Sequence, residues 1–276
     1  MLILVFIITM ALCAVLAVGQ NSRVYESEQL DRVGYGDVTS WIIEQPGVED
    51  LIDQIEELRG TEKTERQKIK QVSYKAGKKQ TQNNGMLAVY EPENYDYYIY
   101  KEDLTGIQKN PKEPKNGEMY VSPSFITMYG VDIGDSVEIQ IAGEEKQMRF
   151  TIRGFFEDPF AGSSMMGVKT MLINKASMEE LEQNALMAGD ASTVADAEML
   201  YIFQKKDSGQ KTKEFIKELN ENTDLKNYTY RSYSKTTIEG FMLIAQNIFV
   251  GFFLVFVTVL VVVAVVVLSH SITTGI

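Results

Sequence analysis

The stretch FMLIAQNIFVGFFLVFVTVLVVVAVVVL, residues 241–268, contains no charged side chain, and the rest of the chain must be arranged around it. A helix needs about 20 apolar residues to cross a hydrocarbon layer of about 30 Å, and this stretch is longer. We therefore predict a membrane-spanning helix that tilts or extends beyond the bilayer, rather than the buried core helix of a soluble protein. Thr236 and Glu239 have the spacing of a capping box, which predicts that the helix begins near Thr237.

A second apolar stretch, Leu2–Val18, lies at the other end of the sequence. A cleaved signal peptide would need a basic segment before this stretch and a small-residue cleavage site after it, whereas no Lys or Arg precedes Leu2. We therefore predict a first transmembrane helix over residues 1–19 and a second over residues 237–276. Because both helices lie at the ends, we expect the sequence to be a piece cut from a larger membrane protein.

The segment between the apolar ends is polar and acidic. Every Lys, Arg, Asp and Glu lies between Arg23 and Glu239, and the chain of 276 residues has a net charge of -11. This charge disfavours nucleic acid as a partner, because phosphates attract Lys and Arg, and it disfavours a surface that binds anionic lipid. Cys13, the single cysteine, lies in the first apolar stretch, so the acidic segment has neither a disulfide nor a thiolate metal site.

Short strands and amphipathic helices follow one another through the acidic segment. Alternating or β-branched residues predict strands at 38–43, 67–74, 86–90, 95–100, 118–121, 137–141, 148–152, 169–173, 199–204 and 228–233. Helical spacing and capping residues predict helices at 48–58, 122–129, 177–187 and 211–219. Asn84-Gly85 predicts a hairpin turn, and the tyrosines between Tyr95 and Tyr100 belong either to a partly exposed strand or to a platform for a stacked ligand. The pattern indicates an α+β fold in which strand–helix–strand units bracket a small β-rich insert.

The sequence offers few residues for catalysis. The single histidine, His270, follows the second apolar stretch, so no histidine-based triad or zinc site can form in the acidic segment. It contains neither a Walker A sequence nor a Gly-x-Gly-x-x-Gly sequence. Carboxylate pairs such as Asp132 and Asp135 lie at predicted turns, which account for them. We therefore expect a protein that is not an enzyme, with no catalytic residues, no metal site and no cofactor.

Three segments of the acidic region resemble a known family. They are GEMYVSPS at 117–124, YGVDIGDSV at 129–137 and FTIRGFFE at 150–157. In this order, between two apolar helices, they resemble FtsX-like ABC transporter permeases with a MacB-like periplasmic core domain. The resemblance implies a discontinuous porter-like α/β layer, residues 20–117 and 176–236, around a small sabre-like insert, residues 118–175, with a transmembrane helix on each side.

The resemblance also implies a function. Permeases of that family lie in the bacterial cell membrane and transmit ATP-driven motion through an extracytoplasmic domain, for export or extraction of a lipid or peptide-like substrate. This chain would then place residues 21–235 outside the cytoplasm. Its partners would be an ABC ATPase subunit, a second permease copy and the lipid membrane, and further membrane helices would follow Ile276.

Two rival functions fit the same layout. Two spans around an extracytoplasmic domain also describe a membrane receptor with a ligand-sensing domain, in which case the residues after Ile276 would continue into a signalling coiled coil. A membrane-tethered surface enzyme is the other rival, and the lack of catalytic residues disfavours it.

The first candidate site is the junction between the last predicted strand and the second membrane helix. It contains Tyr233, Ser234, Thr236 and Glu239. Because so few residues separate strand from helix, we expect this junction to be helical or tightly turned. Movement of the helix would then pass directly into the α/β layer.

The second candidate site is the loop Asp158–Gly167. Phe160, Met165 and Met166 are large apolar side chains in a loop that also contains two glycines and two serines. Loops lie at the surface, where apolar side chains gain nothing unless something covers them. These three side chains therefore either fold back to close the end of the β-rich insert or contact a substrate, a second permease copy or an accessory protein.

Overall fold

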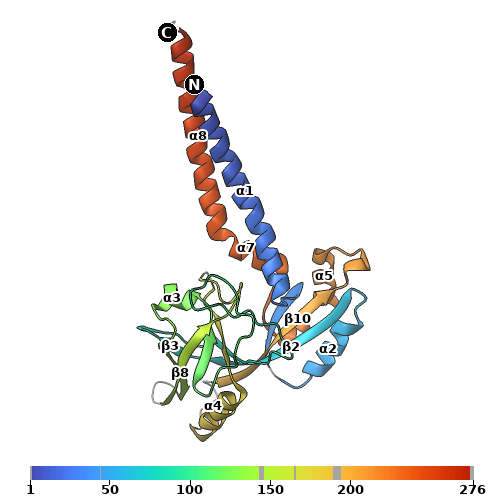
Figure 1. Cartoon of the computed structure of the whole chain (residues 1–276). Helices are drawn as coiled ribbons and strands as arrows, with labels where there is room; N and C mark the ends of the chain where they lie inside the picture. The colour runs from blue at the N-terminus through green and yellow to red at the C-terminus, as the bar shows by residue number, and fades with distance from the viewer. Residues whose placement is uncertain (1, 44, 143–145, 165, 189–193, 274–276) are drawn as a thin grey trace. The chain divides into compact units, whose positions relative to one another are not determined.

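The chain folds into two compact units (Figure 1). The computed structural model describes residues 2–43, 45–142, 146–164, 166–188 and 194–273. The helical unit consists of Met1–Gln29 and Glu239–Ile276, and the α/β unit consists of Leu30–Ile238. The chain passes from one unit to the other within two helices, α1 (Leu2–Arg32) and α7 (Lys235–Met242).

The helical unit contains the predicted C-terminal membrane helix. Helix α8 (Ile244–Thr273) follows α7. Within the described residues, its segment Asn247–Val267 is the one helical stretch that is long and apolar enough to cross a membrane. Large side chains along it, such as Phe252 and Val255, are exposed in the chain. This exposure is compatible with a membrane span and does not fit the buried core helix of a soluble protein.

Helix α1 is longer than the predicted first span. It continues without a break to Arg32, because Gly19 alone does not stop a helix and the Glu, Gln and Leu residues beyond it favour one. It ends where Gly34 adopts a φ of 78° and the N–H groups of Gly34 and Tyr35 donate to carbonyls of the last turn. Residues 20–32 are therefore helical and do not belong to the α/β layer as predicted, while a membrane span within residues 1–19 stays a prediction.

Eleven strands form one mixed sheet in the described part of the α/β unit. Their order is β11-β1-β10-β2-β5-β9-β6-β8-β7-β3-β4. The strands are β1 (Val38–Ile43), β2 (Thr61–Val72), β3 (Tyr74–Ala76), β4 (Lys79–Gln80), β5 (Gly85–Val89), β6 (Glu118–Val121), β7 (Ser136–Ala142), β8 (Lys146–Phe155), β9 (Lys169–Ile173), β10 (Val194–Gln204) and β11 (Thr229–Ser234). Neighbours are antiparallel except for the parallel pairs β5–β9 and β6–β8. The predicted strands at 38–43, 118–121 and 169–173 are confirmed to the residue.

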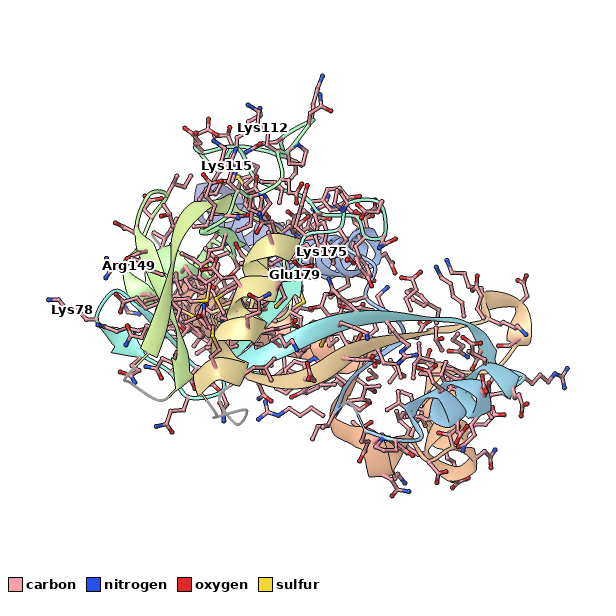
Figure 2. The ribbon with its side chains drawn as sticks, turned by 90° about the horizontal axis from the view of Figure 1, so that it is seen from below. Lys78, Lys112, Lys115, Arg149, Lys175 and Glu179 are labelled. Atoms are coloured by element: carbon pink, nitrogen blue, oxygen red, sulfur yellow. The ribbon has the colours of Figure 1, made fainter. Side chains whose placement is uncertain are left out.

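Helices pack on this sheet in two groups, each with its own apolar core. The helices of the α/β unit are α2 (Val48–Glu57), α3 (Ser124–Tyr129), α4 (Lys175–Ala188), α5 (Thr212–Asn222) and α6 (Leu225–Tyr228). One core joins α2, α5 and α6 to β1 and β10, and Figure 1 shows α2 and α5 beside the long strands β2 and β10. The other core joins α3 and α4 to the strands from β3 to β9. On α4, Met178 and Leu181 are buried in that core, whereas Lys175 and Glu179 are exposed (Figure 2).

The division between layer and insert differs from the predicted one. The core around α4 includes residues from β3 and β5, which precede 118, and residues of α4 itself, which follow 175. The cause is β2, which pairs with β10 along its length and with β5 over Ile69–Val72. One continuous sheet therefore connects both cores, and α4 belongs with the β-rich part. The mixed α/β character and the two-part layer around that β-rich part agree with the predicted fold class.

Two local predictions are wrong. Asn84-Gly85 is not a hairpin turn, because Gly85 lies in β5 and pairs with Val72. A side chain at Gly85 would meet Met171 and Tyr74 at 2.7 and 2.9 Å, so the glycine serves close packing. The segment 95–100 is a loop with one isolated bridge, and the hydroxyl of Tyr95 fixes it by donating to the Arg66 carbonyl at 2.5 Å.

Candidate functional site

The junction between sheet and helix contains no intervening residue. Strand β11 ends at Ser234 and helix α7 begins at Lys235. The Lys235 N–H still donates to the Asp37 carbonyl at 2.9 Å, so the first helical residue remains bonded to the chain next to β1. Ser234 acts as the N-cap, because its Oγ accepts from the Thr237 N–H at 3.2 Å. The predicted capping box of Thr236 and Glu239 is therefore not the start of the helix, which begins at the residue before Thr236.

An ion pair joins the two chain passages of the α/β unit. Asp31 lies in the last turn of α1, and its Oδ1 accepts from Lys235 Nζ, the first residue of α7, at 2.6 Å. The Lys235 side chain is mostly buried, with 17% of its surface exposed, so this pair is less screened by water than an ordinary surface pair. The end of α1 and the start of α7 are thus bonded directly to each other.

A second ion pair attaches the end of α1 to the chain that follows β8. Arg32 Nη2 donates to both carboxylate oxygens of Glu157, at 2.5 and 2.7 Å. The Glu157 side chain is almost fully buried, which makes a charged donor obligatory. The Arg32 guanidinium also lies 5.1 Å from the centre of the Tyr98 ring, a cation–π distance.

Phe160 brings the two predicted sites together. Its ring is fully buried and meets the Tyr233 ring edge-on at 5.1 Å and the Tyr35 ring at 6.2 Å. The loop after β8 therefore packs against the strand that leads into α7. Burial also removes Phe160 from the residues that could touch a partner, which corrects that prediction. Met166 is half-buried, and Met165 lies outside the described residues.

A buried lysine holds this loop in shape. Lys169 Nζ donates to the carbonyls of Ala161, Ser163 and Val168 at 2.9, 2.7 and 3.2 Å and also to that of Met166. Its side chain is fully buried, and this burial lowers the pKa of Lys169 to about 8, although the Asp158 carboxylate opposes the shift. The sequence signal was a lysine at the first position of the otherwise apolar strand β9.

We call these residues the junction cluster: Asp31, Arg32, Tyr35, Glu157, Phe160, Tyr233 and Lys235. The structure unites Phe160 and Tyr233, which were predicted as separate sites, and adds five residues that sequence reasoning missed. No pattern marks those five, because Arg32 and Glu157 lie 125 positions apart. The cluster consists of ion pairs and stacked rings, which resist displacement. In the residues that the structure describes, no group of His, Cys, Asp and Glu could hold a metal ion.

Comparisons with known proteins place permease domains beside this fold. No protein-family model matches the sequence, and no curated protein matches it. Three solved structures are similar to it. A domain of a protein described as a permease from Porphyromonas gingivalis is 16% identical, with 71% of this chain and 87% of that chain covered and a TM-score of 0.31.

The periplasmic region of MacB from Actinobacillus actinomycetemcomitans is 11% identical, with 76% and 94% covered and a TM-score of 0.31. The extracellular domain of the noncanonic ABC-type transporter YknZ from Gram-positive bacteria is 11% identical, with 71% and 98% covered and a TM-score of 0.29. The chain is thus similar to extracytoplasmic domains of ABC-type permeases, the class that the segments at 117–124, 129–137 and 150–157 resemble.

Proposed function

We propose that this chain is part of an ABC-type permease in a bacterial cell membrane, and that its α/β unit lies outside the cytoplasm and moves with the membrane helices. The observation that supports this most is the direct passage of β11 into α7 at Ser234 and Lys235. A strand that is bonded into a sheet cannot follow a helix without moving the sheet. The function is mechanical, and the chain needs no catalytic residue to perform it.

The bonds of β11 are suited to carrying force. It pairs with β1 from Val38 to Ile42, and Ser232 Oγ accepts from Ser40 Oγ at 2.9 Å. Ladder hydrogen bonds that lie side by side share a load applied along the strand. The ion pairs of Asp31 with Lys235 and of Arg32 with Glu157 attach the second chain passage to the same region. Both passages therefore enter the α/β unit at the junction cluster.

The partners follow from the resemblance stated above. The chain itself contains no nucleotide-binding sequence, so an ABC ATPase subunit would supply the energy. A second permease copy would complete the transporter. The transported compound would be a lipid or peptide-like molecule that is exported or extracted from the membrane. The junction residues Tyr233, Ser234, Thr236 and Glu239 would transmit the motion.

Insertion of a flexible linker tests this proposal. A short Gly-Ser segment after Ser234, in the full-length protein, should abolish transport by the complete transporter, because flexible linkers do not transmit force. The same segment after Lys109, in an exposed loop away from the junction, is the matched control and should leave transport intact. Membrane content and melting temperature check that both proteins fold. Full transport with the linker after Ser234 would contradict the proposal.

A further inference from the structure

A cavity of about 370 Å³ lies beside the junction cluster, within the α/β unit. Its walls come from the end of α1, the strands β2 and β10, the loop 92–97 and the segment 156–158. Its volume falls in the range of about 300–1,000 Å³ that is typical of small-molecule sites. The mechanical function proposed above makes no use of it.

Aromatic rings form much of the cavity wall. They are Tyr35, Tyr95, Tyr97, Phe156, Tyr201 and Phe203. Tyr35 and Tyr201 meet edge-on, with their centres 5.8 Å apart, and both come from the side that borders the junction cluster. The face of an aromatic ring carries partial negative charge and attracts cations. An amine of this chain already uses the wall in that way, because Lys63 Nζ lies 4.7 Å from the centre of the Phe203 ring.

The charged residues of the wall are mainly carboxylates. They are Asp31, Glu65, Glu93, Asp96, Glu157 and Asp158, against two cations, Arg32 and Lys63. Each cation is already bonded to a carboxylate of the same wall, Arg32 to Glu157 and Lys63 to Glu65, both at 2.5 Å.

Three wall carboxylates have no cationic partner of their own. Among the residues that the structure describes, Glu93, Asp96 and Asp158 form no ion pair. Lys169 lies behind the wall and offsets part of the Asp158 charge, since that carboxylate raises its pKa against the effect of burial. Glu93 and Asp96 are exposed at the cavity. The cavity therefore has an excess of negative charge that a bound cation would neutralise.

One phenol in the wall is without a hydrogen-bond partner. Burial, followed by the Asp158 carboxylate, raises the pKa of Tyr201 well above its ordinary value, so the hydroxyl keeps its proton. That hydroxyl makes no hydrogen bond within the described part of the chain. Tyr35 differs, because its hydroxyl donates to Asp158 at 3.1 Å. A polar atom left unpaired in a cavity wall indicates a place for a ligand atom, here one that donates to the phenol oxygen.

We propose that this cavity binds a small alkylammonium ion. The rings would surround the alkyl chain and the cation, Glu93 and Asp96 would attract the charge, and the Tyr201 oxygen would accept a hydrogen bond from the ammonium group. An anion of the same size is disfavoured, because the two wall cations are already paired. This binding does not depend on the proposed mechanical function, and either can fail without the other.

Calorimetric titration of the full chain in nanodiscs of zwitterionic lipid tests the proposal, with empty nanodiscs as the blank. n-Butylammonium should bind at least about tenfold more tightly than neutral butan-1-ol, the difference expected for a cation in an aromatic and acidic wall. Butanoate should not bind. Equal affinity for n-butylammonium and butan-1-ol, or no heat from n-butylammonium, would overturn the proposal.

Three variants locate the site. Glu93→Gln with Asp96→Asn should weaken n-butylammonium binding at least about threefold, whereas Asp53→Asn with Glu57→Gln removes the same charge from the exposed face of α2 and should change nothing. Tyr201→Phe keeps the ring and removes the acceptor, so it should weaken n-butylammonium more than tetramethylammonium, which has no N–H. An equal effect of both double variants would place the binding outside this cavity, and an equal loss for both ions would remove Tyr201 from the site.

Discussion

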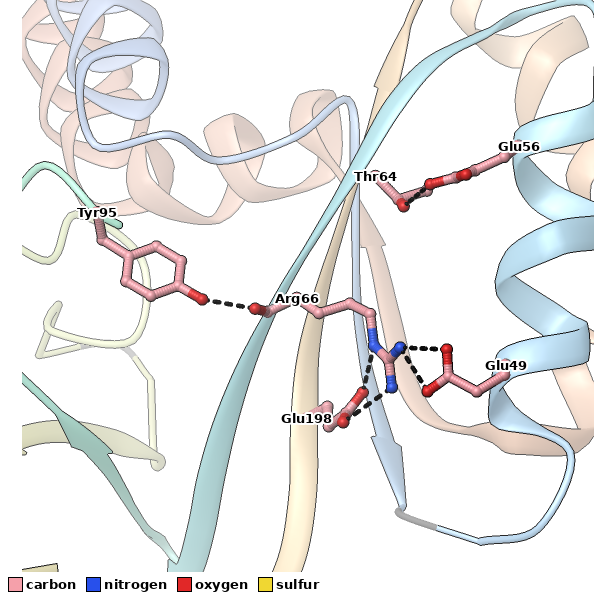
Figure 3. Close-up of polar contacts among 6 residues, drawn as sticks. All are labelled: Glu49, Glu56, Thr64, Arg66, Tyr95 and Glu198. Atoms are coloured by element: carbon pink, nitrogen blue, oxygen red, sulfur yellow. Dashed lines mark hydrogen bonds and ion pairs between the residues drawn. The ribbon is translucent and has the colours of Figure 1, made fainter. Parts of the chain in front are cut away.

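At the scale of single residues, Arg66 is the most heavily bonded cation of the α/β unit (Figure 3). Its Nε and Nη2 donate to the Glu198 carboxylate at 2.8 and 3.0 Å, and its Nη1 donates to both oxygens of Glu49 at 2.8 Å. These bonds join β2 to β10 and to α2. Glu198 has only 1% of its side chain exposed, whereas Glu49 has 78% exposed, so the two ion pairs differ in energetic weight.

We expect Arg66→Ala to lower the free energy of unfolding by about 3–5 kcal/mol, because it leaves Glu198 charged, buried and without its partner. Glu49→Ala breaks only the exposed pair and should cost less than about 1 kcal/mol. Arg66→Met combined with Glu198→Met should recover most of the loss, since apolar side chains need no charge partner. Urea denaturation measures all three variants. Equal losses for Arg66→Ala and Glu49→Ala would show that burial of Glu198 does not matter.

Lys169 gives a pH dependence whose sign can be stated. Burial lowers its pKa to about 8 in the folded protein, while an unfolded lysine titrates near about 10.4. Between these values the unfolded state binds more protons than the folded state. The contribution of this residue to stability therefore rises with pH through that window.

We expect the stability difference between wild type and Lys169→Met to grow in favour of the wild type from about pH 8 to about pH 10. Below this window the variant should already be less stable by about 1–3 kcal/mol, because it leaves buried carbonyls of the loop unpaired. Melting temperatures of the two proteins across this pH range provide the measurement. Parallel pH profiles would mean that Lys169 does not titrate there.

At the scale of elements, the loop 158–164 depends on one side chain. Phe160 is enclosed by Tyr35 and Tyr233, so Phe160→Ala should remove about 3–5 kcal/mol from the free energy of unfolding. Met166→Ala, at a half-buried position of the same loop, is the matched control and should cost clearly less. Chemical denaturation compares the two. Similar small losses would show that the ring does not anchor the loop.

Strands and helices with a strong local pattern could be predicted from the sequence. Residues 38–43 and 169–173 are dense in residues that suit strands, and Val48, Leu51 and Ile55 have helical spacing, so all three elements were found. The tyrosines from Tyr95 to Tyr100 misled, because their hydroxyls bond to neighbouring carbonyls and hold a loop in place. A hydroxyl bond to a distant backbone leaves no periodic signal.

Helix starts were misplaced for a related reason. The spacing of Ser177 and Glu180 predicted a capping box, yet α4 begins at Lys175, and Asn174 Oδ1 accepts from the Ser177 N–H at 2.9 Å. Ser177 Oγ instead accepts from the Gly117 N–H at 3.1 Å, a contact across the α/β unit. Competition between a local cap and a distant partner is decided by the fold and cannot be read from spacing alone. The same limit hid the ion pair of Arg32 with Glu157.

At the scale of the whole molecule, the arrangement requires that the α/β unit lies on one side of a membrane. Both chain passages enter that unit at the junction cluster, so a single face of it would be turned to the bilayer. The charge distribution agrees, because every Lys, Arg, Asp and Glu lies between Arg23 and Glu239. A charged unit of this size cannot lie in the hydrocarbon layer, so the question is only on which side it lies.

Cysteine labelling decides that side. In a Cys13→Ser background, Lys79→Cys and Lys206→Cys are both at exposed positions of the α/β unit and should react with a membrane-impermeant maleimide in whole cells. Thr273→Cys at the far end of α8 is the matched control and should react only after the membrane is permeabilised. Protection of Lys79→Cys and Lys206→Cys in intact cells, with Thr273→Cys reactive, would reverse the orientation. Protection of one and reaction of the other would contradict the two-span arrangement, because the continuous sheet that carries both positions cannot be divided by a bilayer.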